Sequence, residues 1–581
     1  MNRREIVKKI FEYLKRYKRE FFIAIIFLII FTSLQLLTPA LLGYIIDNKL
    51  AEGVDLTEIK SIILLVGGYF LMGIIQSVFR YFSNLKFFGI ANLLAIDIRE
   101  DLYDHIQKLP MSFYDKTAVG KIVTRLTNDT DALKEFFKNA FSQLLTSLAF
   151  IVLTIVLLLI AAPWALIFII VPMPIIYYLI KTYDKKSIGP LRKYRKSLSN
   201  INSDINENIE GMGVIRSFNV EDGVYEEFKD LNDKTKDLAM EYHRITVTLG
   251  GSNMTNVLQR LNTRIILGLF VYMNLQGNLY FSVGLMYILV DYTERIYQQV
   301  SRIMVRISDF ERSIAATEQI FQIFAIEPEK SKDRAGVKLK GDVEFKNLPF
   351  YYVDEDYVLK DISFKANSGM SVALVGETGS GKSSIINLIF RLYKEQKGEI
   401  LFDGINANDY SIYDLRDNMA IVLQDPFIFN DTLRNNISLG DEFTDEKIYE
   451  SLISVGGENL YKNMEDGLDT IMAKGGSNLS QGEKQIITFA RAIIRDPNIL
   501  VLDEATSSID TETETYIQIG LDKLKEGRTT FTIAHRLSTI KDSDLILVLK
   551  DGEIIERGDH DSLIDNKGQY YKMLEKEIRE G

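Results

Sequence analysis

The sequence contains no cysteine among its 581 residues, and it has only four histidines and one tryptophan. The lack of cysteine excludes disulfide bridges, thiolate metal sites and a cysteine nucleophile. Charged residues are absent from four long stretches, at 21–46, 61–79, 141–180 and 265–290. Buried helices of a soluble protein seldom run so far without a charge, so these stretches indicate membrane spans. The composition also excludes collagen-like and disordered proteins.

The charge-free stretches predict six membrane-spanning helices, because a span needs about 20 apolar residues to cross the hydrocarbon core. The stretch 141–180 is about twice that length, and Ala162-Pro163-Trp164 divides it. A polar segment at 274–278 divides the last stretch. A cleaved signal peptide is not expected, since the apolar region of such a peptide spans only about 7–15 residues. The predicted spans are 21–46, 59–81, 138–161, 163–184, 248–273 and 279–301.

The N-terminal segment 1–20 is basic and has apolar residues at helical spacing. This pattern is typical of a helix that lies in the membrane interface. The positive-inside rule places this segment in the cytoplasm, and six spans return the C-terminal half to the same side. The long polar segments 82–137 and 185–247 are then cytoplasmic too. Residues 326–341 are charged and rich in helix breakers, so we expect a linker there.

The two halves of the chain differ in charge. Residues 1–320 carry 37 Lys and Arg against 32 Asp and Glu, whereas the remaining residues carry 31 against 47. A nucleic-acid-binding protein needs a basic surface, so the acidic second half argues against nucleic acid as a partner.

A glycine-rich segment in the second half matches a phosphate-binding loop. Residues 371–375 are predicted to form a buried strand, Gly376–Ser383 reads Gly-Glu-Thr-Gly-Ser-Gly-Lys-Ser, and a helical pattern follows. Backbone N–H groups of such a loop approach phosphate closely, and the helix N-terminus favours an anion. We expect Lys382 to reach the β- and γ-phosphates and Ser383 to bind Mg²⁺. The predicted ATP-binding residues here are Gly376, Glu377, Thr378, Gly379, Ser380, Gly381, Lys382, Ser383 and Ser384.

A second predicted strand, 499–504, ends in two carboxylates, Asp503 and Glu504. A carboxylate at a strand end beside a phosphate loop can hold Mg²⁺ through water, which is the role we expect for Asp503. Glu504 follows directly and can polarise the attacking water.

From about residue 340 to 575 the chain resembles the nucleotide-binding domain of an ATP-binding cassette (ABC) transporter. The family's markers occur in order, and the resemblance implies a role for each. Tyr352 would stack on adenine, Gln424 would contact Mg²⁺, Asp510 lies in the D-loop, and His535 would contact the γ-phosphate. The family signature coincides with Leu479-Ser480-Gln481-Gly482-Glu483.

The first half resembles the membrane domain of an exporter, in which six spans precede the nucleotide-binding domain on one chain. Residues 111–116 with 120–125, and residues 211–218, resemble the two cytoplasmic coupling segments. The resemblance implies an all-α six-helix transmembrane domain followed by an α/β P-loop ATPase domain with a helical subdomain. The expected domains are 1–325 and 342–581, with the linker 326–341 between them.

The implied function is ATP-driven export of hydrophobic or amphipathic small molecules by alternating access. ATP and Mg²⁺ are the implied cofactors, and the expected location is a bacterial plasma membrane with both termini in the cytoplasm. The expected partners are a second half-transporter chain, the lipid bilayer and a small-molecule substrate, and no nucleic acid. A soluble ABC ATPase is disfavoured by the spans. A peptide exporter with its own protease is disfavoured because no protease domain precedes the first span.

The signature departs from the family pattern LSGGQ. Gln481 replaces a glycine where close backbone approach is needed, and Glu483 replaces a neutral glutamine with a negative charge. The chain's own phosphate loop and carboxylates are intact. This combination resembles the catalytically competent subunit of heterodimeric bacterial multidrug exporters, which have one degenerate ATP site. The alternative is a homodimeric lipid flippase or exporter.

Charged residues also occur inside the fifth and sixth predicted spans. Charges within a membrane face protein or water rather than lipid, because lipid exposure is costly. They either contact substrate in a cavity or join two helices to each other, and both interpretations stay open. The candidate cavity residues are Arg260, Arg264, Asp291 and Glu294, with Arg295 beside them.

Overall fold

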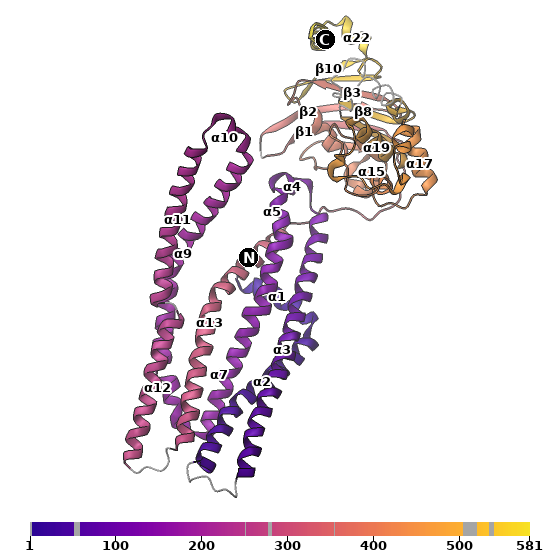
Figure 1. The fold of residues 1–581 in the computed structure, drawn as a ribbon. Helices are drawn as coiled ribbons and strands as arrows, with labels where there is room; N and C mark the ends of the chain where they lie inside the picture. The colour runs from indigo at the N-terminus through magenta and orange to yellow at the C-terminus, as the bar shows by residue number, and fades with distance from the viewer. Residues whose placement is uncertain are drawn as a thin grey trace. The chain divides into compact units, whose positions relative to one another are not determined.

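The computed structural model describes residues 3–50, 59–249, 251–276, 282–353, 355–503, 520–533 and 540–580 (Figure 1). The chain forms two compact units. The first unit comprises residues 1–107 and 119–326, and the second comprises residues 108–118 and 327–581. The short segment 108–118 thus belongs with the second unit, although it lies in the sequence of the membrane half.

The first unit is helical throughout its described residues. Its α-helices are α1 (Arg3–Arg16), α2 (Lys18–Ile45), α3 (Ile59–Gln107), α5 (Val119–Thr124), α6 (Thr130–Glu135), α7 (Ser142–Ala161), α8 (Ile167–Ile170), α9 (Met173–Glu210), α10 (Met212–Phe218), α11 (Glu221–Leu249), α12 (Gly251–Leu275) and α13 (Val283–Phe324). Three π-helical turns, η1 (Ile46–Leu50), η3 (Arg125–Asp129) and η4 (Phe136–Phe141), and a 3₁₀ turn, η5 (Pro163–Leu166), join some of them.

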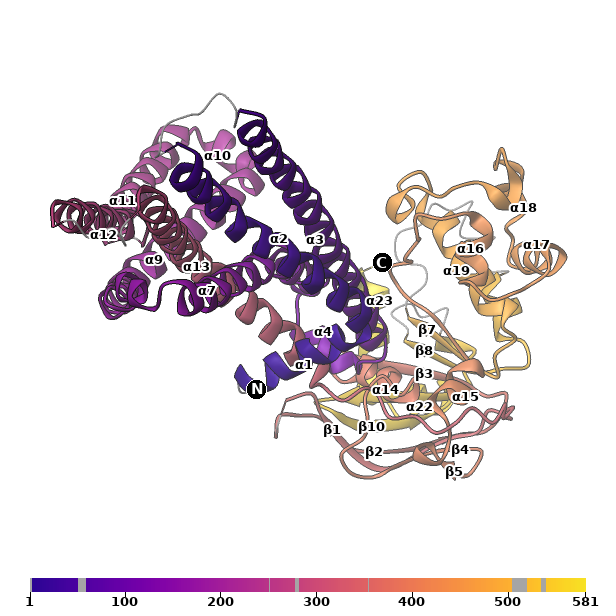
Figure 2. The ribbon, with the colours of Figure 1, turned by 90° about the horizontal axis from the view of Figure 1, so that it is seen from below.

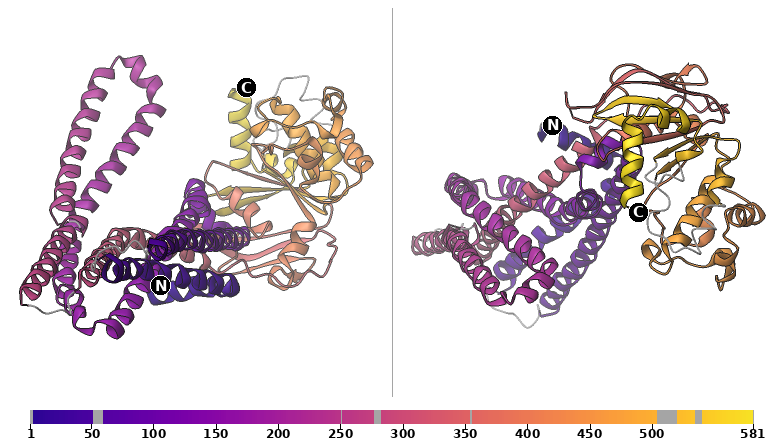
Figure 3. Two further views of the ribbon diagram at one scale, coloured as in Figure 1. Left: turned by 60° about the horizontal axis from the view of Figure 1, so that its bottom comes forward. Right: turned by 90° about the horizontal axis from the view of Figure 1, so that it is seen from above.

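Local sequence explains where several of these helices begin and end. Pro163 cannot continue α7, and the chain re-enters helix through η5. Ser282 caps α13 by accepting a hydrogen bond from the backbone N–H of Leu285. Asn219 ends α10 in the left-handed conformation. Helices α9 and α11 consequently run side by side as a long hairpin with α10 at its tip (Figure 3).

Four helical segments within the described ranges are long and apolar enough to cross a membrane: Lys18–Lys49, Ile59–Gln107, Val119–Ala161 and Pro163–Glu210. They contain the first four predicted spans. Most of the fifth predicted span lies on α12 and most of the sixth on α13, whereas residues 250 and 279–281 of these spans lie outside the described residues. Charged residues such as Arg264 and Asp291 lower the mean hydropathy of these two helices.

Helices α2 and α13 pack closely at one end. A Cβ added at Gly284 would lie 2.2 Å from the carbonyl oxygen of Gly43, so only glycine permits this approach. The Asp47 carboxylate accepts hydrogen bonds from the Ser282 hydroxyl at 2.5 Å and from the Gly284 N–H at 2.7 Å. Further along, the buried Tyr292 hydroxyl donates to the carbonyl of Leu36 at 2.6 Å.

The second unit contains two sheets with helices around them (Figures 1 and 2). One sheet has the order β2-β1-β4-β5, and the other has the order β10-β9-β3-β8-β7-β6. Strands β3, β6, β7, β8 and β9 are parallel to their neighbours in this group. The strands are β1 (Val343–Tyr351), β2 (Tyr357–Ala366), β3 (Ser371–Gly376), β4 (Glu399–Phe402), β5 (Ile405–Asn406), β6 (Met419–Val422), β7 (Ile499–Asp503), β8 (Thr529–Ile533), β9 (Leu545–Lys550) and β10 (Glu553–Gly558).

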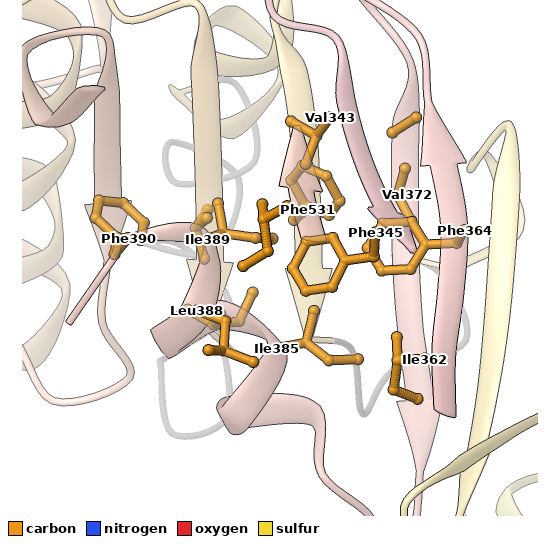
Figure 4. Packing of buried hydrophobic residues seen from close by; sticks show 14 of the residues in the cluster. Val343, Phe345, Ile362, Phe364, Val372, Ile385, Leu388, Ile389, Phe390 and Phe531 are labelled. Atoms are coloured by element: carbon orange, nitrogen blue, oxygen red, sulfur yellow. The ribbon is translucent and has the colours of Figure 1, made fainter. Parts of the chain in front are cut away.

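Several helices of the second unit contribute to its hydrophobic cores. Helix α14 (Lys382–Ile389) packs against the sheets, and its Ile385 and Leu388 meet Phe345, Phe364 and Phe531 in one core (Figure 4). A second core joins β6 and β7 to the helices that are labelled α16 to α19 in Figure 2. The helices are α4 (Met111–Lys116), α14, α15 (Ile412–Asp417), α16 (Leu433–Ser438), α17 (Asp445–Ser454), α18 (Glu458–Lys462), α19 (Gln481–Ile494), α22 (His560–Asp565) and α23 (Gln569–Glu580).

Candidate nucleotide-binding site

The predicted phosphate-binding loop connects the buried strand β3 to α14. Gly381 precedes the helix at φ 106°, and a Cβ there would lie 2.5 Å from Cδ2 of Leu359. A larger residue therefore fits neither the backbone conformation nor the space. A helix N-terminus that follows such a loop presents backbone N–H groups and a favourable dipole to an anion.

Two buried polar side chains of the loop can contact an anionic ligand. The Lys382 ammonium donates to the carbonyl oxygens of Gly376 at 2.7 Å and Glu377 at 2.9 Å, and its side chain is buried. The Ser380 hydroxyl is buried without a hydrogen-bond partner among the described residues. Buried polar groups are normally satisfied, so the loop fits a ligand that supplies oxygen atoms.

Parallel strands bring the predicted carboxylate to the edge of the sheet where this loop lies. Asp503 at the end of β7 pairs with Ile533 of β8, and Ile533 pairs with Leu374 of β3. The carboxyl ends of parallel strands meet at one edge, which is where α/β sheets bind ligands. Gln424 is exposed just after β6, whose Val422 pairs with Leu502 in β7. The strand order thus brings Asp503 and Gln424 to the loop's edge.

The predicted adenine-stacking residue lies against the helix that follows the loop. The Tyr352 hydroxyl donates to the Ser384 hydroxyl at 3.1 Å and accepts from the Asn387 amide at 2.9 Å. Two other rings, Phe350 and Tyr393, lie nearly perpendicular to the Tyr352 ring, with centroids 4.8 Å and 4.9 Å from its own. Tyr352 as a whole remains 36% exposed, which leaves a surface for a base.

The signature segment forms the N-terminus of α19, and its polar groups bond to each other. The Ser480 hydroxyl accepts a hydrogen bond from the Glu483 N–H at 3.2 Å. The Glu483 carboxylate in turn accepts from the Ser480 N–H at 2.8 Å. This is a reciprocal capping box. Gln481 is the first residue of the helix, and Gly482 is buried.

Three predicted site residues lie outside the described residues. These are Glu504, Asp510 and His535. Their assignments stay predictions.

The described donor groups fit a magnesium nucleotide. Within the described ranges, no group of three or more His, Asp or Glu side chains could hold a metal ion. Mg²⁺ is commonly bound by only one or two protein carboxylates together with substrate phosphates. Asp503 at the strand end and the exposed Ser383 hydroxyl at the start of α14 match that arrangement.

The segment 108–118 is attached to the second unit by hydrogen bonds at both ends. The Glu329 N–H donates to the carbonyl of Lys108 at 2.7 Å, and Arg416 pairs with the Glu329 carboxylate at 3.3 Å. At the other end, the Tyr393 hydroxyl donates to the Asp115 carboxylate. Tyr393 also touches Tyr352, so one side chain connects the expected base-binding ring to the expected first coupling segment. The sequence did not identify Tyr393, because a single tyrosine outside a motif does not indicate which residues it contacts.

Arg491 of α19 is a second residue that the sequence did not reveal. Its guanidinium donates to the carbonyl of Phe427 at 2.6 Å and to the Asn436 side chain at 2.8 Å. Burial lowers the pKa of Arg491 to about 10, because desolvation penalises the charged form. Arg491 thereby connects α19, the helix that begins in the signature segment, to the segment that follows Gln424.

Comparisons with known proteins cover both halves. Residues 21–289 match the model of the ABC transporter transmembrane region, and residues 359–507 match the ABC transporter model. Proteins similar over most of their length carry both halves too. A probable multidrug resistance ABC transporter ATP-binding/permease protein of Bacillus subtilis, YheH, is 39% identical over 89% of this chain and 77% of its own.

The chain belongs to the ABC transporter family. A putative ABC transporter ATP-binding protein of Streptococcus pneumoniae, exp8, is 34% identical over 98% of this transporter and 96% of its own length. A solved bacterial Atm1-family ABC exporter with ATP bound shares the fold, with a TM-score of 0.83, 23% identity, and coverage of 96% of this chain and 99% of that chain. The predicted fold class and the coupling of an ATPase domain to a transport domain are thereby confirmed.

The membrane domain of this transporter has an open cavity of about 800 Å³ along α2, α3 and α13, lined largely by exposed side chains. Arg295 is the charged side chain among its described lining residues, and it pairs with Asp291 at 2.5 Å. The predicted candidates Arg260, Arg264 and Glu294 are exposed and belong elsewhere on α12 and α13. The lining consists of Gln35, Thr38, Tyr69, Phe70, Gly73, Ile74, Gln76, Ser77, Val78, Tyr81, Phe82 and Arg295.

Proposed function

We propose that this chain is one half of an exporter that moves hydrophobic or amphipathic small molecules out of the cytoplasm by alternating access. A half-transporter with one membrane domain and one ATPase domain implies a dimer in a membrane. We place both termini in the cytoplasm of a bacterial cell, because the N-terminal helix is basic. The name of the YheH relative, a probable multidrug resistance transporter, supports export of small molecules.

We base the proposed ATPase roles on the residues at the carboxyl ends of the parallel strands. Lys382 and the loop N–H groups bind the phosphates, and Tyr352 stacks on adenine. Ser383, Gln424 and Asp503 hold Mg²⁺. Bound ATP supplies the free energy that favours the closed state of the dimer.

The remaining proposed roles fall on Glu504, His535 and Asp510. Glu504 orients and deprotonates the attacking water, and His535 contacts the γ-phosphate. Asp510 belongs to the loop that faces the partner chain.

We further propose a heterodimer in which the ATP site that uses this chain's signature is degenerate. The observation that carries this proposal is the capping box of Ser480 and Glu483. The N–H groups of Ser480 and Glu483 already donate within the capping box, and a carboxylate lies at the helix N-terminus that should attract phosphate. A second chain with an intact signature would complete the competent site with this chain's Lys382 and Glu504.

The experiment that tests the heterodimer is purification of the tagged chain from its native membranes. We expect a second half-transporter chain in equal amount. Ser480→Ala should lower ATP turnover much less than Glu504→Gln, because Ser480 serves the degenerate site. Thr444→Ala is a matched control, since Thr444 caps α17 in the same way. A symmetric homodimer of this chain with substrate-stimulated hydrolysis at both sites would contradict the proposal and favour the homodimeric lipid transporter.

The cavity of the membrane domain supports the proposed substrate class. Aromatic rings such as Tyr69 and Phe82 line it together with the amide of Gln35, and the pairing of Arg295 with Asp291 neutralises its charge. Polar side chains in a span face protein or water rather than lipid. We therefore propose that this cavity, with Asp291 beside it, contacts amphipathic aromatic molecules, and that Arg260, Arg264 and Glu294 contribute only where the partner chain covers them.

A transport assay in vesicles tests the cavity. Arg295→Gln leaves Asp291 unpaired, so we expect faster uptake of the cationic dye ethidium and slower uptake of carboxyfluorescein. Arg302→Gln on the same helix provides a control outside the cavity lining. Equal changes in both variants would show that the cavity does not select the substrate.

A further inference from the structure

A second cavity of the membrane domain has an entirely apolar surface. Its volume is about 100 Å³, and it lies between α1, the α6–η4 segment and α13. None of its described lining residues is charged. The lining consists of Ile10, Phe11, Leu133, Phe136, Phe137, Phe141, Ser313, Ile314 and Thr317.

The hydroxyl groups among the lining residues donate hydrogen bonds to backbone carbonyls of the protein. The Ser313 hydroxyl donates to the carbonyl of Ala132 at 3.3 Å, and the Thr317 hydroxyl donates to the carbonyl of Ser313 at 2.7 Å. An apolar cavity without polar partners stays free of water and binds apolar groups. The π-helical turn η4, a rare conformation that is frequent at functional sites, forms one side.

Hydrogen bonds and ion pairs to α3 hold helix α1 at the side of this cavity. The Tyr13 hydroxyl donates to Asp101 at 3.0 Å, and the Tyr17 hydroxyl donates to Asp97 at 2.9 Å. Arg16 pairs with both carboxylates, at 3.1 and 3.2 Å. These bonds hold one face of α1 against α3. Its apolar residues then border the cavity, and Phe11 remains 47% exposed at the edge.

The cavity borders the start of the apolar run in α2. Phe21, the first residue of the apolar run in α2, stacks on Phe141 with centroids 6.2 Å apart and an interplanar angle of 29°. Phe141 is also a lining residue of the cavity. An acyl chain that leaves the bilayer at this level therefore meets the cavity without crossing a polar layer.

We propose that this cavity holds part of an acyl chain of an anionic phospholipid. The acyl chain matches the apolar surface, and the charge of α1 selects the headgroup. Lys8 and Lys15 are exposed on this helix, and the Lys9 ammonium lies 4.8 Å above the Phe321 ring. Basic residues at the membrane surface attract anionic lipids, and an amphipathic basic helix binds where both contributions act together.

The chain is well suited to a fluorescence test because Trp164 is its one tryptophan. Trp164→Phe gives a silent background, into which Phe11→Trp places a reporter at the edge of the cavity. Phe22→Trp is the matched control, since Phe22 is 65% exposed on α2 away from the cavity lining. Each full-length variant is reconstituted in phosphatidylcholine vesicles that contain equal fractions of dibrominated phosphatidylglycerol or dibrominated phosphatidylcholine.

Brominated acyl chains quench tryptophan only at contact, so the two lipids report selection directly. At position 11 we expect at least about twofold stronger quenching by the phosphatidylglycerol, since each surface lysine contributes about 1 kcal/mol. At position 22 we expect equal quenching by both lipids. Adding Ile314→Phe, which fills the cavity, should reduce quenching at position 11 by both lipids. Adding Lys8→Gln and Lys15→Gln should remove the preference and leave the phosphatidylcholine signal.

Two results would overturn the proposal. Equal quenching of the position 11 reporter by both lipids would show that no anionic lipid is selected. Selective quenching that persists after Ile314→Phe would show that the lipid contacts the outer surface of α1 and not the cavity. If the Ile314→Phe variant does not fold, the comparison of the two lipids with and without Lys8→Gln and Lys15→Gln still tests the proposal.

Discussion

Tyr393→Phe tests whether the segment 108–118 is fastened to the nucleotide-binding unit at its far end. The change removes the hydroxyl that donates to Asp115 and keeps the ring, which packs against Tyr352 and Phe350. A hydrogen bond to a charged group is worth about 1.5–3 kcal/mol, and the lower value applies because Asp115 is exposed. A loss of about 1.5 kcal/mol changes an opening equilibrium about tenfold.

Hydrogen–deuterium exchange measures this opening directly. We expect amides 111–117 to exchange about tenfold faster in Tyr393→Phe, with ATP binding unchanged. ATP hydrolysis should continue while its stimulation by substrate falls. Tyr410→Phe is the control, because Tyr410 packs on the same core and its hydroxyl donates to Phe402 at 3.1 Å. Unchanged exchange in Tyr393→Phe, or an equal increase in both variants, would refute the reasoning.

Three further predictions concern the reaction, the core and the end of the membrane domain. Glu504→Gln should keep ATP binding and lower Mg²⁺-dependent hydrolysis about 10²–10⁴-fold, and full turnover would exclude Glu504 as the base. Glu395→Gln leaves the buried guanidinium of Arg391 without its ion pair, so the nucleotide-binding unit should lose about 3–5 kcal/mol in a thermal melt. Asp47→Ala removes the acceptor of the Ser282 hydroxyl. Amides 283–286 should then exchange faster, by an amount equivalent to about 1 kcal/mol, whereas no change would mean that this contact does not hold α13.

The sequence predicted the fold class because its signals are local. Charge-free runs mark helices that must satisfy their own backbone in lipid, and the glycine-rich loop fixes a strand, a turn and a helix in one motif. The same loop gave the position of Lys382, and the strand pattern placed Asp503 at the matching edge. These features depend on residues that are neighbours in the chain.

Long-range contacts could not be predicted in this way. Nothing near Tyr393 in the sequence points to Asp115, which is 278 residues away. The capping box of Ser480 and Glu483 is the opposite case, since the spacing of three residues is itself the signal. The charges in two spans remain candidates for a substrate cavity. The lining of the open cavity in the structure comes instead largely from uncharged residues of α3, whose polar groups such as Gln76 are too sparse to lower the mean hydropathy.

The assignment of residues 108–118 to the second unit means that the polypeptide passes between the two units three times, after residues 107, 118 and 326. A protease that cut the linker 326–341 would therefore not release an independent ATPase fragment. The fragment would still hold 108–118 through Tyr393, and through Glu329 as well if the cut precedes that residue. The ATPase fragment would therefore stay bound to the membrane fragment although no peptide bond joins them. The gene for such a transporter could likewise be divided at the linker, and its two products would retain a specific attachment point.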